Sequence, residues 1–396
     1  MEFEHCTMVH RYEQVRVYTP KEFERRWALA REVAAKAGCG ALLVCGPSAE
    51  GLDQYLADVR GLSAVILPLR GGAVGILRGR LDRGDGSLQI REVTHPDIRV
   101  LKDYPGGTLA DLLGPAGSRV AVAFPGAMSA ILRDALDEVL PGTELVDVTL
   151  PLTVARAAKS EEDLRCIALA NRVHEQAMLA MPQVIRVGRT FRDVSNDITE
   201  LLCSLGSGNA LIHAFLICVG PMDGPADMRA FFPAPGRVFE PGDRMQVLME
   251  TNGPGGHVTA IGRFFCLGEP TESWQKLVDM CIRAQDFAVS MLKPGERLTN
   301  IVRQTRRFIE GCGWETNDQC FMHGMGYHMY EQYAINDMTE DVPLCDGAFL
   351  HAHPVIKRRY PGMDWVEPFH HLDAYLVGPE GGVCTNHVPR KLFVLD

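Results

Sequence analysis

The stretch Arg186-Val-Gly-Arg-Thr-Phe-Arg-Asp-Val194 returns later in the chain in a related form, as Lys293-Pro-Gly-Glu-Arg-Leu-Thr-Asn-Ile301. Each copy opens a stretch of 21 residues, which ends Cys203-Ser-Leu-Gly206 in the first copy and Glu310-Gly-Cys-Gly313 in the second. A long helical pattern precedes each copy. Two helix–loop–helix units, each followed by strands, predict a pseudo-symmetric α+β domain. Ligand pockets favour the interface between such halves.

The residues before this repeat predict a smaller α/β domain, because helical and strand patterns alternate there. The expected helices are 22–37 and 129–139, and the expected strands are 41–45, 64–68, 73–77 and 119–124. Two prolines and a glycine between residues 141 and 152 indicate a boundary. We therefore expect an N-terminal domain at 1–152 and a second domain at 153–396. Ser160 and Asp163 have the spacing of a helix capping box at the start of the second domain.

Composition excludes several classes of protein. A chain of 396 residues suits two domains. Its net charge of −10 argues against nucleic acid or an anionic membrane surface as the main partner. No apolar run is long enough to span a membrane, and the polar N-terminus lacks a signal-peptide pattern. The 12 cysteines are scattered without any CxxC pair, which indicates a reduced, cytoplasmic protein rather than a disulfide or structural zinc framework.

Carboxylates follow two predicted strands of the second domain. The first strand runs into a Gly/Pro loop that carries Asp223 and Asp227. Either could orient a substrate cation or act as a base, although a turn aspartate that bonds its own backbone is an equal alternative for Asp223. Glu250 ends the second strand, in a glycine-rich hairpin that also holds His257. A buried carboxylate needs a partner or a raised pKa, so Glu250 is a candidate site residue.

Histidines give the strongest chemical signal in the sequence. Glycines surround His323, and Tyr330 and Glu331 follow it. His351 and His353 are two apart on a predicted strand and so share one face. Histidine shuttles protons near neutral pH and is also the commonest metal ligand. The sequence therefore predicts a histidine-rich site. His370, His371 and Asp373, on a later strand, are neighbouring polar residues, with solvated surface histidines as the alternative.

The order of these motifs resembles the pita-bread family, which contains methionine aminopeptidase, aminopeptidase P, prolidase and creatinase. The motifs run from the Lys-Ser-Glu-Glu helix start at Lys159 to the C-terminal hairpin, and together with the N-terminal domain the resemblance covers nearly the whole chain. The N-terminal domain is similar to that of creatinase and prolidase. The resemblance implies an α+β architecture, with a C-terminal pseudo-two-fold pita-bread domain behind a smaller α/β domain.

The resemblance also implies where metal ligands would lie. Metallopeptidases of this family hold two metal ions with two aspartates, a histidine and two glutamates. In chain order, the corresponding positions here are Met249 or Glu250, then Ala260, His323, His353 and Leu372. At most two of the five ligands are kept, so two hard cations would not be held close together. Creatinase looks like a metal-free relative with alanine at the Ala260 position, and we therefore expect neither a metal nor another cofactor.

These observations predict a metal-independent hydrolase or lyase, not a peptidase, that cleaves a C–N or similar C–heteroatom bond in a small polar substrate. A histidine would be the general base, carboxylates would bind a cationic group or orient the imidazoles, and a tyrosine would donate a proton. The predicted catalytic residues are Asp227, Glu250, His323, Tyr330, Glu331 and His353. The predicted substrate-binding residues are Arg60, Asp223, His257, His351, His371 and Asp373.

Two other functions stay open at this point. One is a mononuclear metal enzyme that uses His323, His353, a neighbouring histidine and Glu250, a ligand set that suits zinc or iron. The other is a non-catalytic protein that binds a small molecule or peptide. The resemblance to creatinase further implies a homodimer in which Arg60 and the aromatic residues near Tyr55 reach the partner's active site.

Overall fold

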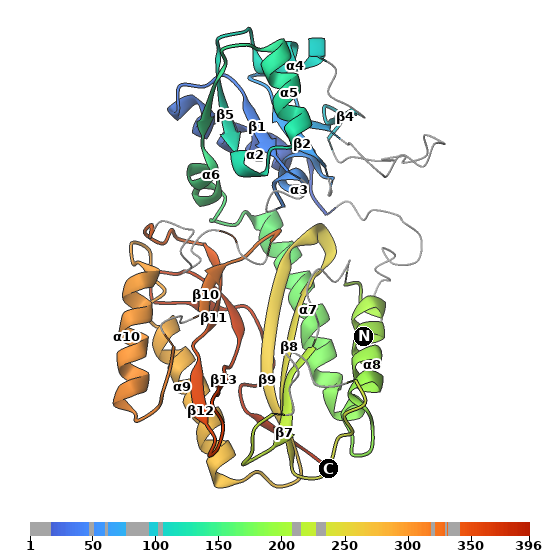
Figure 1. Cartoon of the computed structure of the whole chain (residues 1–396), viewed down its shortest axis with the longest axis vertical. Helices are drawn as coiled ribbons and strands as arrows, with labels where there is room; N and C mark the ends of the chain where they lie inside the picture. The colour runs from blue at the N-terminus through green and yellow to red at the C-terminus, as the bar shows by residue number, and fades with distance from the viewer. Residues whose placement is uncertain are drawn as a thin grey trace. The chain divides into compact units, whose positions relative to one another are not determined.

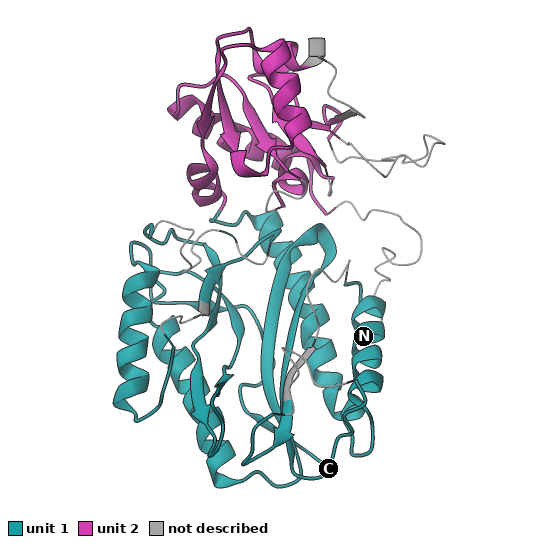
Figure 2. Cartoon of the chain, in the orientation of Figure 1, with its two compact units in different colours: residues 1–15, 157–396 teal, residues 16–156 magenta. Residues whose placement is uncertain are grey.

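The computed structural model of the chain describes residues 17–46, 51–59, 62–76, 95–101, 106–207, 215–226, 235–317, 321–328, 331 and 341–396. The described residues fall into two compact units, one within Arg16–Arg156 and one within Ala157–Asp396 (Figure 2). The units divide just after helix α6, Thr149–Ala155. This helix contains Leu152, the last residue of the expected N-terminal domain.

The smaller unit is built on a mixed sheet of six strands, in the order β4-β3-β2-β1-β5-β6. Its strands β2 and β3, which fall within the expected strands 64–68 and 73–77, pair antiparallel. Apolar residues of the sheet pack against α4 and α5 and form the core of the unit. Besides α6, its elements are α2 Pro20–Lys36, β1 Leu42–Cys45, α3 Leu52–Ala57, β2 Ala64–Leu67, β3 Val74–Ile76, β4 Arg99–Leu101, α4 Gly106–Leu113, β5 Arg119–Ala123, η2 Pro125–Ala127, α5 Ala130–Val139 and β6 Glu144–Asp147.

The larger unit contains two four-stranded sheets and a short hairpin. The first sheet has the order β16-β9-β8-β7, the second has the order β10-β11-β14-β15, and β12 pairs with β13. The helices are α7 Glu161–Val184, α8 Phe191–Ser204, η3 Pro254–Gly256, α9 Glu272–Val289 and α10 Leu298–Gly311. The strands are β7 Phe215–Pro221, β8 Asp243–Asn252, β9 Val258–Leu267, β10 Phe321–Gly324, β11 Phe349–His353, β12 Ile356–Arg359, β13 Val366–Phe369, β14 Asp373–Leu376, β15 Val383–Cys384 and β16 Leu392–Leu395.

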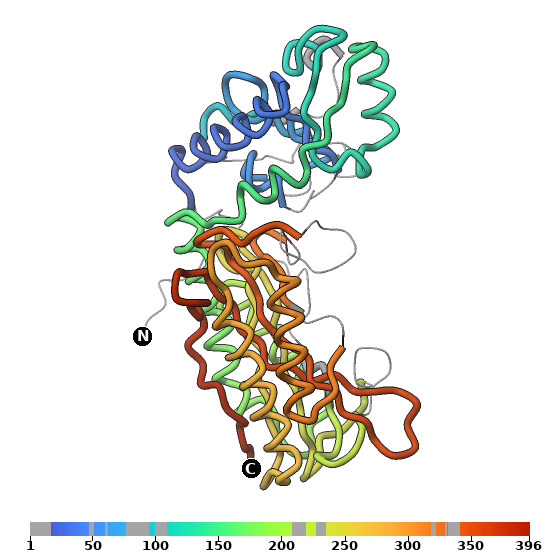
Figure 3. Tube along the Cα trace, turned by 90° about the vertical axis from the view of Figure 1, so that its left-hand side faces the viewer, coloured from blue at the N-terminus to red at the C-terminus, as the bar shows by residue number. Residues whose placement is uncertain are grey.

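Helices flank the two sheets of the larger unit. Figure 1 shows α7 and α8 on one side of the strands and α9 and α10 on the other. Helices α9 and α10 run side by side in both views (Figures 1 and 3) and contact one another. Each half is thus a helix pair with its own sheet, which is the arrangement that the internal repeat predicts.

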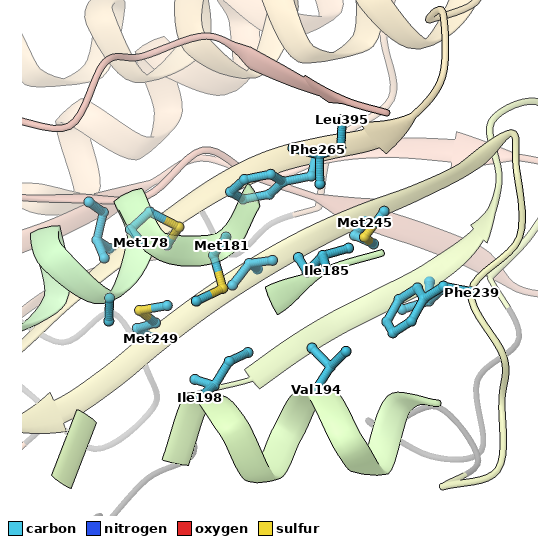
Figure 4. Packing of buried hydrophobic residues seen from close by; sticks show 14 of the residues in the cluster. Met178, Met181, Ile185, Val194, Ile198, Phe239, Met245, Met249, Phe265 and Leu395 are labelled. Atoms are coloured by element: carbon cyan, nitrogen blue, oxygen red, sulfur yellow. The ribbon is translucent and has the colours of Figure 1, made fainter. Parts of the chain in front are cut away.

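The first half packs its helix pair onto the first sheet. Met178 and Met181 of α7 and Ile198 of α8 meet Met245 and Met249 of β8 in a common apolar cluster (Figure 4). The start of α7 is fixed by its capping box, which forms as predicted. The Ser160 side chain accepts a bond from the Asp163 backbone, and the Asp163 side chain accepts one from the Ser160 backbone.

The second half repeats this construction. Leu350 and Ala352 of β11 pack against Leu292 and against Leu298 of α10. Because successive strand residues point to opposite faces, every second residue of β11 is left to face the first half of the unit. This alternation positions the candidate site.

Candidate functional site

Three histidines gather on the neighbouring strands β10 and β11. The strands run antiparallel, and their register sets His323 opposite His351 and Phe321 opposite His353. One ring nitrogen of each histidine lies within 4.8 Å of those of the other two. The Nε2 atoms of His323 and His353 are 3.4 Å apart. We call His323, His351 and His353 the three-histidine cluster.

The alternation of β11 decides which way this cluster faces. Leu350 and Ala352 enter the core beside α10, so His351 and His353 point away from that helix. Phe349 shares their face and packs against α7 and β9. The cluster therefore lies on the inner face of the second sheet, toward the first half of the unit.

Burial keeps the imidazoles of His351 and His353 neutral. His351 has no exposed surface, and desolvation, followed by the neighbouring imidazoles, lowers its pKa well below the ordinary value. The pKa of His353 is lowered well below the ordinary value for the same reasons. Both ring nitrogens of His351 are buried without a hydrogen-bond partner among the described residues. Neutral imidazole nitrogen is the form that binds metal ions, so the cluster is suited to hold a cation.

Glu250 lies on the inner face of the first sheet. It pairs directly with Ala260 across the β8–β9 ladder, and directly opposed residues point to the same side. Its neighbour Met249 points the other way, into the core against α8. Of the two positions that the resemblance leaves open for the first ligand, Glu250 is thus the one on the inner face.

The carboxyl group of Glu250 has the properties of a general base. Desolvation raises its pKa from 4.5 to about 7. No hydrogen bond or ion pair to another described residue involves its side chain, and it is not part of the group of ligand atoms that the three histidines form. A carboxylate that titrates near neutral pH can both accept and return a proton under ordinary conditions.

Backbone bonds hold the two sheets together along β9. The Val258 amide donates to the Gly326 carbonyl at 2.7 Å, and Gly262 forms a bridge with Leu372. A Cβ atom at Gly262 would lie 2.9 Å from the Cβ of Leu372, so the approach needs a glycine. Ala260 lies between these two connections, which sets it and Glu250 beside the second sheet.

Further imidazoles extend the cluster along the second sheet. The ring of His370 lies 5.0 Å from that of His353, and its buried Nδ1 has no partner among the described residues. Its pKa falls to about 4 through desolvation and then through His371. On α7, Nε2 of His174 lies 2.8 Å from the Thr251 hydroxyl. The site is therefore rich in neutral imidazole and poor in carboxylate.

His371 and Asp373 belong to a buried polar network. The Asp373 carboxylate accepts from Arg263 at 2.8 Å and from Asn386 at 3.1 Å. Nδ1 of His371 lies 3.0 Å from the Gln285 side-chain oxygen and 3.3 Å from Asp373. Burial by itself would raise the pKa of Asp373, but Arg263 and His371 hold it below the ordinary value. The network ties α9 to both sheets.

His257 and Glu331 occupy a second polar group, at the tip of the β8–β9 hairpin. Nε2 of His257 lies 3.0 Å from the Asp163 carboxylate at the start of α7. Glu331 forms an ion pair with Lys159 at 3.1 Å and accepts from the Tyr327 amide at 2.8 Å. All four charged or titratable side chains in these pairs are buried. We call Lys159, Asp163, His257 and Glu331 the hairpin-tip group.

Of the remaining predicted residues, only Asp223 falls within the part of the chain that the structure describes. Asp223 is at the surface, where it accepts from the Thr271 hydroxyl at 3.1 Å and lies 3.4 Å from Arg358. The residues Arg60, Asp227 and Tyr330 fall outside those that the structure describes.

Sequence reasoning missed two residues that shape the site. Lys159, which pairs with Glu331, is separated from it by 172 residues. The other is Gln285 of α9, whose side-chain oxygen is within hydrogen-bond distance of His371. A lysine before a capping serine and a glutamine on an apolar helix face are each ordinary in sequence, so only the fold reveals their partners.

Comparison with known proteins identifies the family. The model of metallopeptidase family M24 matches residues 165–383, which is more than half of the chain. The chain belongs to metallopeptidase family M24. It is 28% identical over 399 residues to a protein of Mycobacterium tuberculosis (strain CDC 1551 / Oshkosh) named "Probable dipeptidase PepE", a match that covers 96% of this chain and 98% of that protein.

Solved M24 structures share the fold. Dipeptidase PepE from Mycobacterium ulcerans superposes with a TM-score of 0.75 at 23% identity, over 96% of this chain and 99% of the other. X-Pro aminopeptidase from Thermotoga maritima gives a TM-score of 0.75 at 19% identity, over 94% and 99%. At these identities the likeness shows the fold alone. It confirms the α+β pita-bread architecture expected from the sequence.

The family and its named members overturn two expectations. We expected a metal-independent hydrolase or lyase and not a peptidase. The chain is instead a metallopeptidase-family member whose relative is named a dipeptidase. The prediction was wrong because it counted lost oxygen ligands at the family positions. It gave less weight to the alternative of a mononuclear metal enzyme that uses His323, His353 and a neighbouring histidine, which fits the family better.

The residues fit one metal ion better than the family's pair. Ala260 and Leu372, at two of the five ligand positions, are apolar and fully buried. The three-histidine cluster offers three nitrogens close together, and His351 has two buried nitrogens that no described residue satisfies. A metal-binding role accounts for such atoms, since buried polar groups are otherwise bonded.

None of the described helices combines the length and the apolar character that crossing a bilayer requires.

Proposed function

We propose that this M24 chain is a metal-dependent hydrolase that cleaves the peptide bond of a short peptide. The observation that carries the proposal is the gathering of the buried His323, His351 and His353 on the inner face of the second sheet. The name of the Mycobacterium tuberculosis relative, "Probable dipeptidase PepE", supports a dipeptide as substrate.

The three imidazoles would hold the ion. A divalent ion held in this way would supply Lewis-acid polarisation of the scissile carbonyl and activation of water. Glu250 would accept a proton from the attacking water at its carboxylate and pass it to the leaving amine nitrogen. Its pKa of about 7 suits both transfers. Apolar Ala260 and Leu372 would keep bulk water away from the reacting groups.

The network of Asp373, Arg263 and His371 would keep the strand after His370 in place. Because its members are buried and bonded to one another, we assign them a structural role and not proton exchange with the substrate. We keep the homodimer and the cytoplasmic location as predictions within this proposal. Light scattering of the purified chain would test the first.

A panel of dipeptides, with and without proline in the second position, tests the proposed function. Release of free amino acids should occur, stop after exhaustive chelation and return when a divalent ion is restored. His353→Ala should remain inactive after the ion is restored. If chelated protein hydrolyses the same dipeptides at the original rate, the proposal fails.

A further inference from the structure

His351 is the member of the three-histidine cluster that the five-ligand pattern of the family does not supply. His323 and His353 stand at ligand positions of that pattern, whereas His351 lies two residues before one of them. Its side chain is fully buried, between Ala374 on one neighbouring strand and His323 on the other. Neither cross-strand neighbour provides a carboxylate or a carbonyl from its side chain.

An unsatisfied imidazole in this place has a cost that the fold must offset. A neutral imidazole carries one donor and one acceptor nitrogen, and both nitrogens of His351 are buried without a partner among the described residues. Leucine at the same position would fill similar space without that cost. The presence of histidine therefore indicates a partner other than the described side chains, such as a bound ligand.

The spacing of the cluster matches a single small cation. Two nitrogens bound to one zinc ion at about 2.0–2.1 Å, at tetrahedral angles, lie about 3.4 Å apart. The Nε2 atoms of His323 and His353 are 3.4 Å apart. The nitrogen of His351 completes a group that spans no more than 4.8 Å, a distance that small side-chain rotations close.

The donor atoms also select the class of ion. Imidazole suits zinc, cobalt and nickel, whereas manganese, magnesium and calcium prefer carboxylate, carbonyl and water oxygens. The cluster offers nitrogen alone, and Ala260 and Leu372 remove oxygen from two positions on the same face. A second ion beside the first would lack bridging carboxylates, because Ala260 and Leu372 are apolar.

We propose that His323, His351 and His353 bind one divalent ion of the zinc class per chain, with His351 as the third protein ligand. This inference rests on the proposed metal-dependent function and makes it specific. It separates this chain from relatives that hold a pair of ions through oxygen.

The test measures metal binding by the full chain, independently of activity. Metal-free protein is titrated separately with Zn²⁺, Co²⁺ and Mn²⁺, and bound metal is counted by mass spectrometry after desalting. We expect one Zn²⁺ or one Co²⁺ per chain and no retained Mn²⁺. The Co²⁺ form should show the strong visible absorption of four-coordinate cobalt. X-ray absorption at the zinc edge should count three imidazoles.

Two matched variants identify the third ligand. His351→Leu should bind zinc at least about 100-fold more weakly, since one of three protein ligands is lost. Its metal-free form should melt a few degrees above metal-free wild type, because the unsatisfied nitrogens are gone. His370→Leu makes the same change at a neighbouring, partly buried imidazole outside the cluster, and it should retain one ion.

The outcomes separate this inference from the proposed function. Two ions per chain, fewer than three imidazoles at the zinc edge, or full binding by His351→Leu would overturn the inference. In each case dipeptide hydrolysis could still depend on metal. Equal loss of zinc in His370→Leu would also overturn it, since the ligand set would then be a different one. Hydrolysis that survives chelation would instead reject the proposed function itself.

Discussion

His257 and His351 are both fully buried, in the same unit, yet their surroundings differ. At the hairpin tip, Nε2 of His257 lies 3.0 Å from the Asp163 carboxylate, and the ring stacks against Tyr327 at 4.5 Å. On β11, the rings of His323 and His353 lie beside that of His351, and both its nitrogens lack a partner among the described residues. One histidine completes a bonded pair, and the other does not.

This difference teaches how to separate a structural histidine from a ligand. A buried imidazole with a carboxylate partner is explained by the fold alone, because the bond offsets its desolvation. A buried imidazole with two unsatisfied nitrogens is explained only by a ligand. The hairpin-tip group should therefore matter for stability, and the three-histidine cluster for metal binding and catalysis.

The largest effect should come from His323→Ala. Removal of one ligand at the centre of the cluster should release the ion and lower kcat/KM for a dipeptide by at least about 10⁴-fold, because metal assistance supplies several kcal/mol of the barrier reduction. Metal content and dipeptide turnover measure this. In the control His257→Gln, at the hairpin tip, the ion should stay bound. A release of metal from both variants would remove the distinction between the two regions.

The hairpin tip should show the opposite behaviour. The Asp163 carboxylate bonds His257 and also completes the capping box of α7 with Ser160. The variant Asp163→Ala removes both interactions. Loss of a charged hydrogen bond and of a cap should lower the free energy of unfolding by about 3–4 kcal/mol. Urea unfolding of the zinc-loaded and the metal-free chain measures it, with Ser160→Ala as a control that removes the cap alone. The zinc-loaded and the metal-free protein should lose nearly the same free energy of unfolding, because the proposed ion site is not at the hairpin tip.

The sequence predicted the fold well because the fold depends on local patterns. Helix starts, strand alternation and the repeat at 186–206 and 293–313 are all readable from neighbouring residues. The shared face of His351 and His353 follows from the period of a strand, and the structure places both in one cluster.

The environment of each polar residue was much harder to predict, because it depends on partners far apart in sequence. Glu331 pairs with Lys159 across 172 residues, and Asp373 pairs with Arg263 across 110. No local pattern shows that these carboxylates are already bonded. The metal-independent function was wrongly inferred for a related reason: the family pattern assigns ligands by position, and His351, which we propose as a ligand, lies outside that pattern.

Glu250 sharpens the comparison as a buried group of a third kind, an acid without a partner among the described residues. Desolvation raises its pKa from 4.5 to about 7. In the unfolded chain it ionises above pH 4.5, but in the metal-free fold it keeps its proton to about pH 7. The free energy of unfolding should therefore fall as pH rises through this window, by up to about 3 kcal/mol at about 1.4 kcal/mol per pH unit.

Urea unfolding of metal-free wild type and Glu250→Gln at pH 5, 6, 7 and 8 measures this. The variant carries a neutral amide and should lack the decline. It should also lose about 10²–10⁴-fold in kcat/KM as the zinc-loaded enzyme, because the proton acceptor is gone. A decline of the same size in both proteins would show that another group titrates.

The smallest effect belongs to Asp223, which provides an exposed reference for the two buried regions. Its side chain is 54% exposed and lies 3.4 Å from Arg358. Ion pairs in contact with water contribute little, since solvent screens them and the side chains lose freedom on pairing. Asp223→Asn should change the free energy of unfolding by no more than about 0.5 kcal/mol and should leave zinc binding unchanged. A dipeptide KM that rises tenfold or more in this variant would return Asp223 to the substrate site, as the sequence first suggested, and would require the loop before β8 to approach the inner face during catalysis.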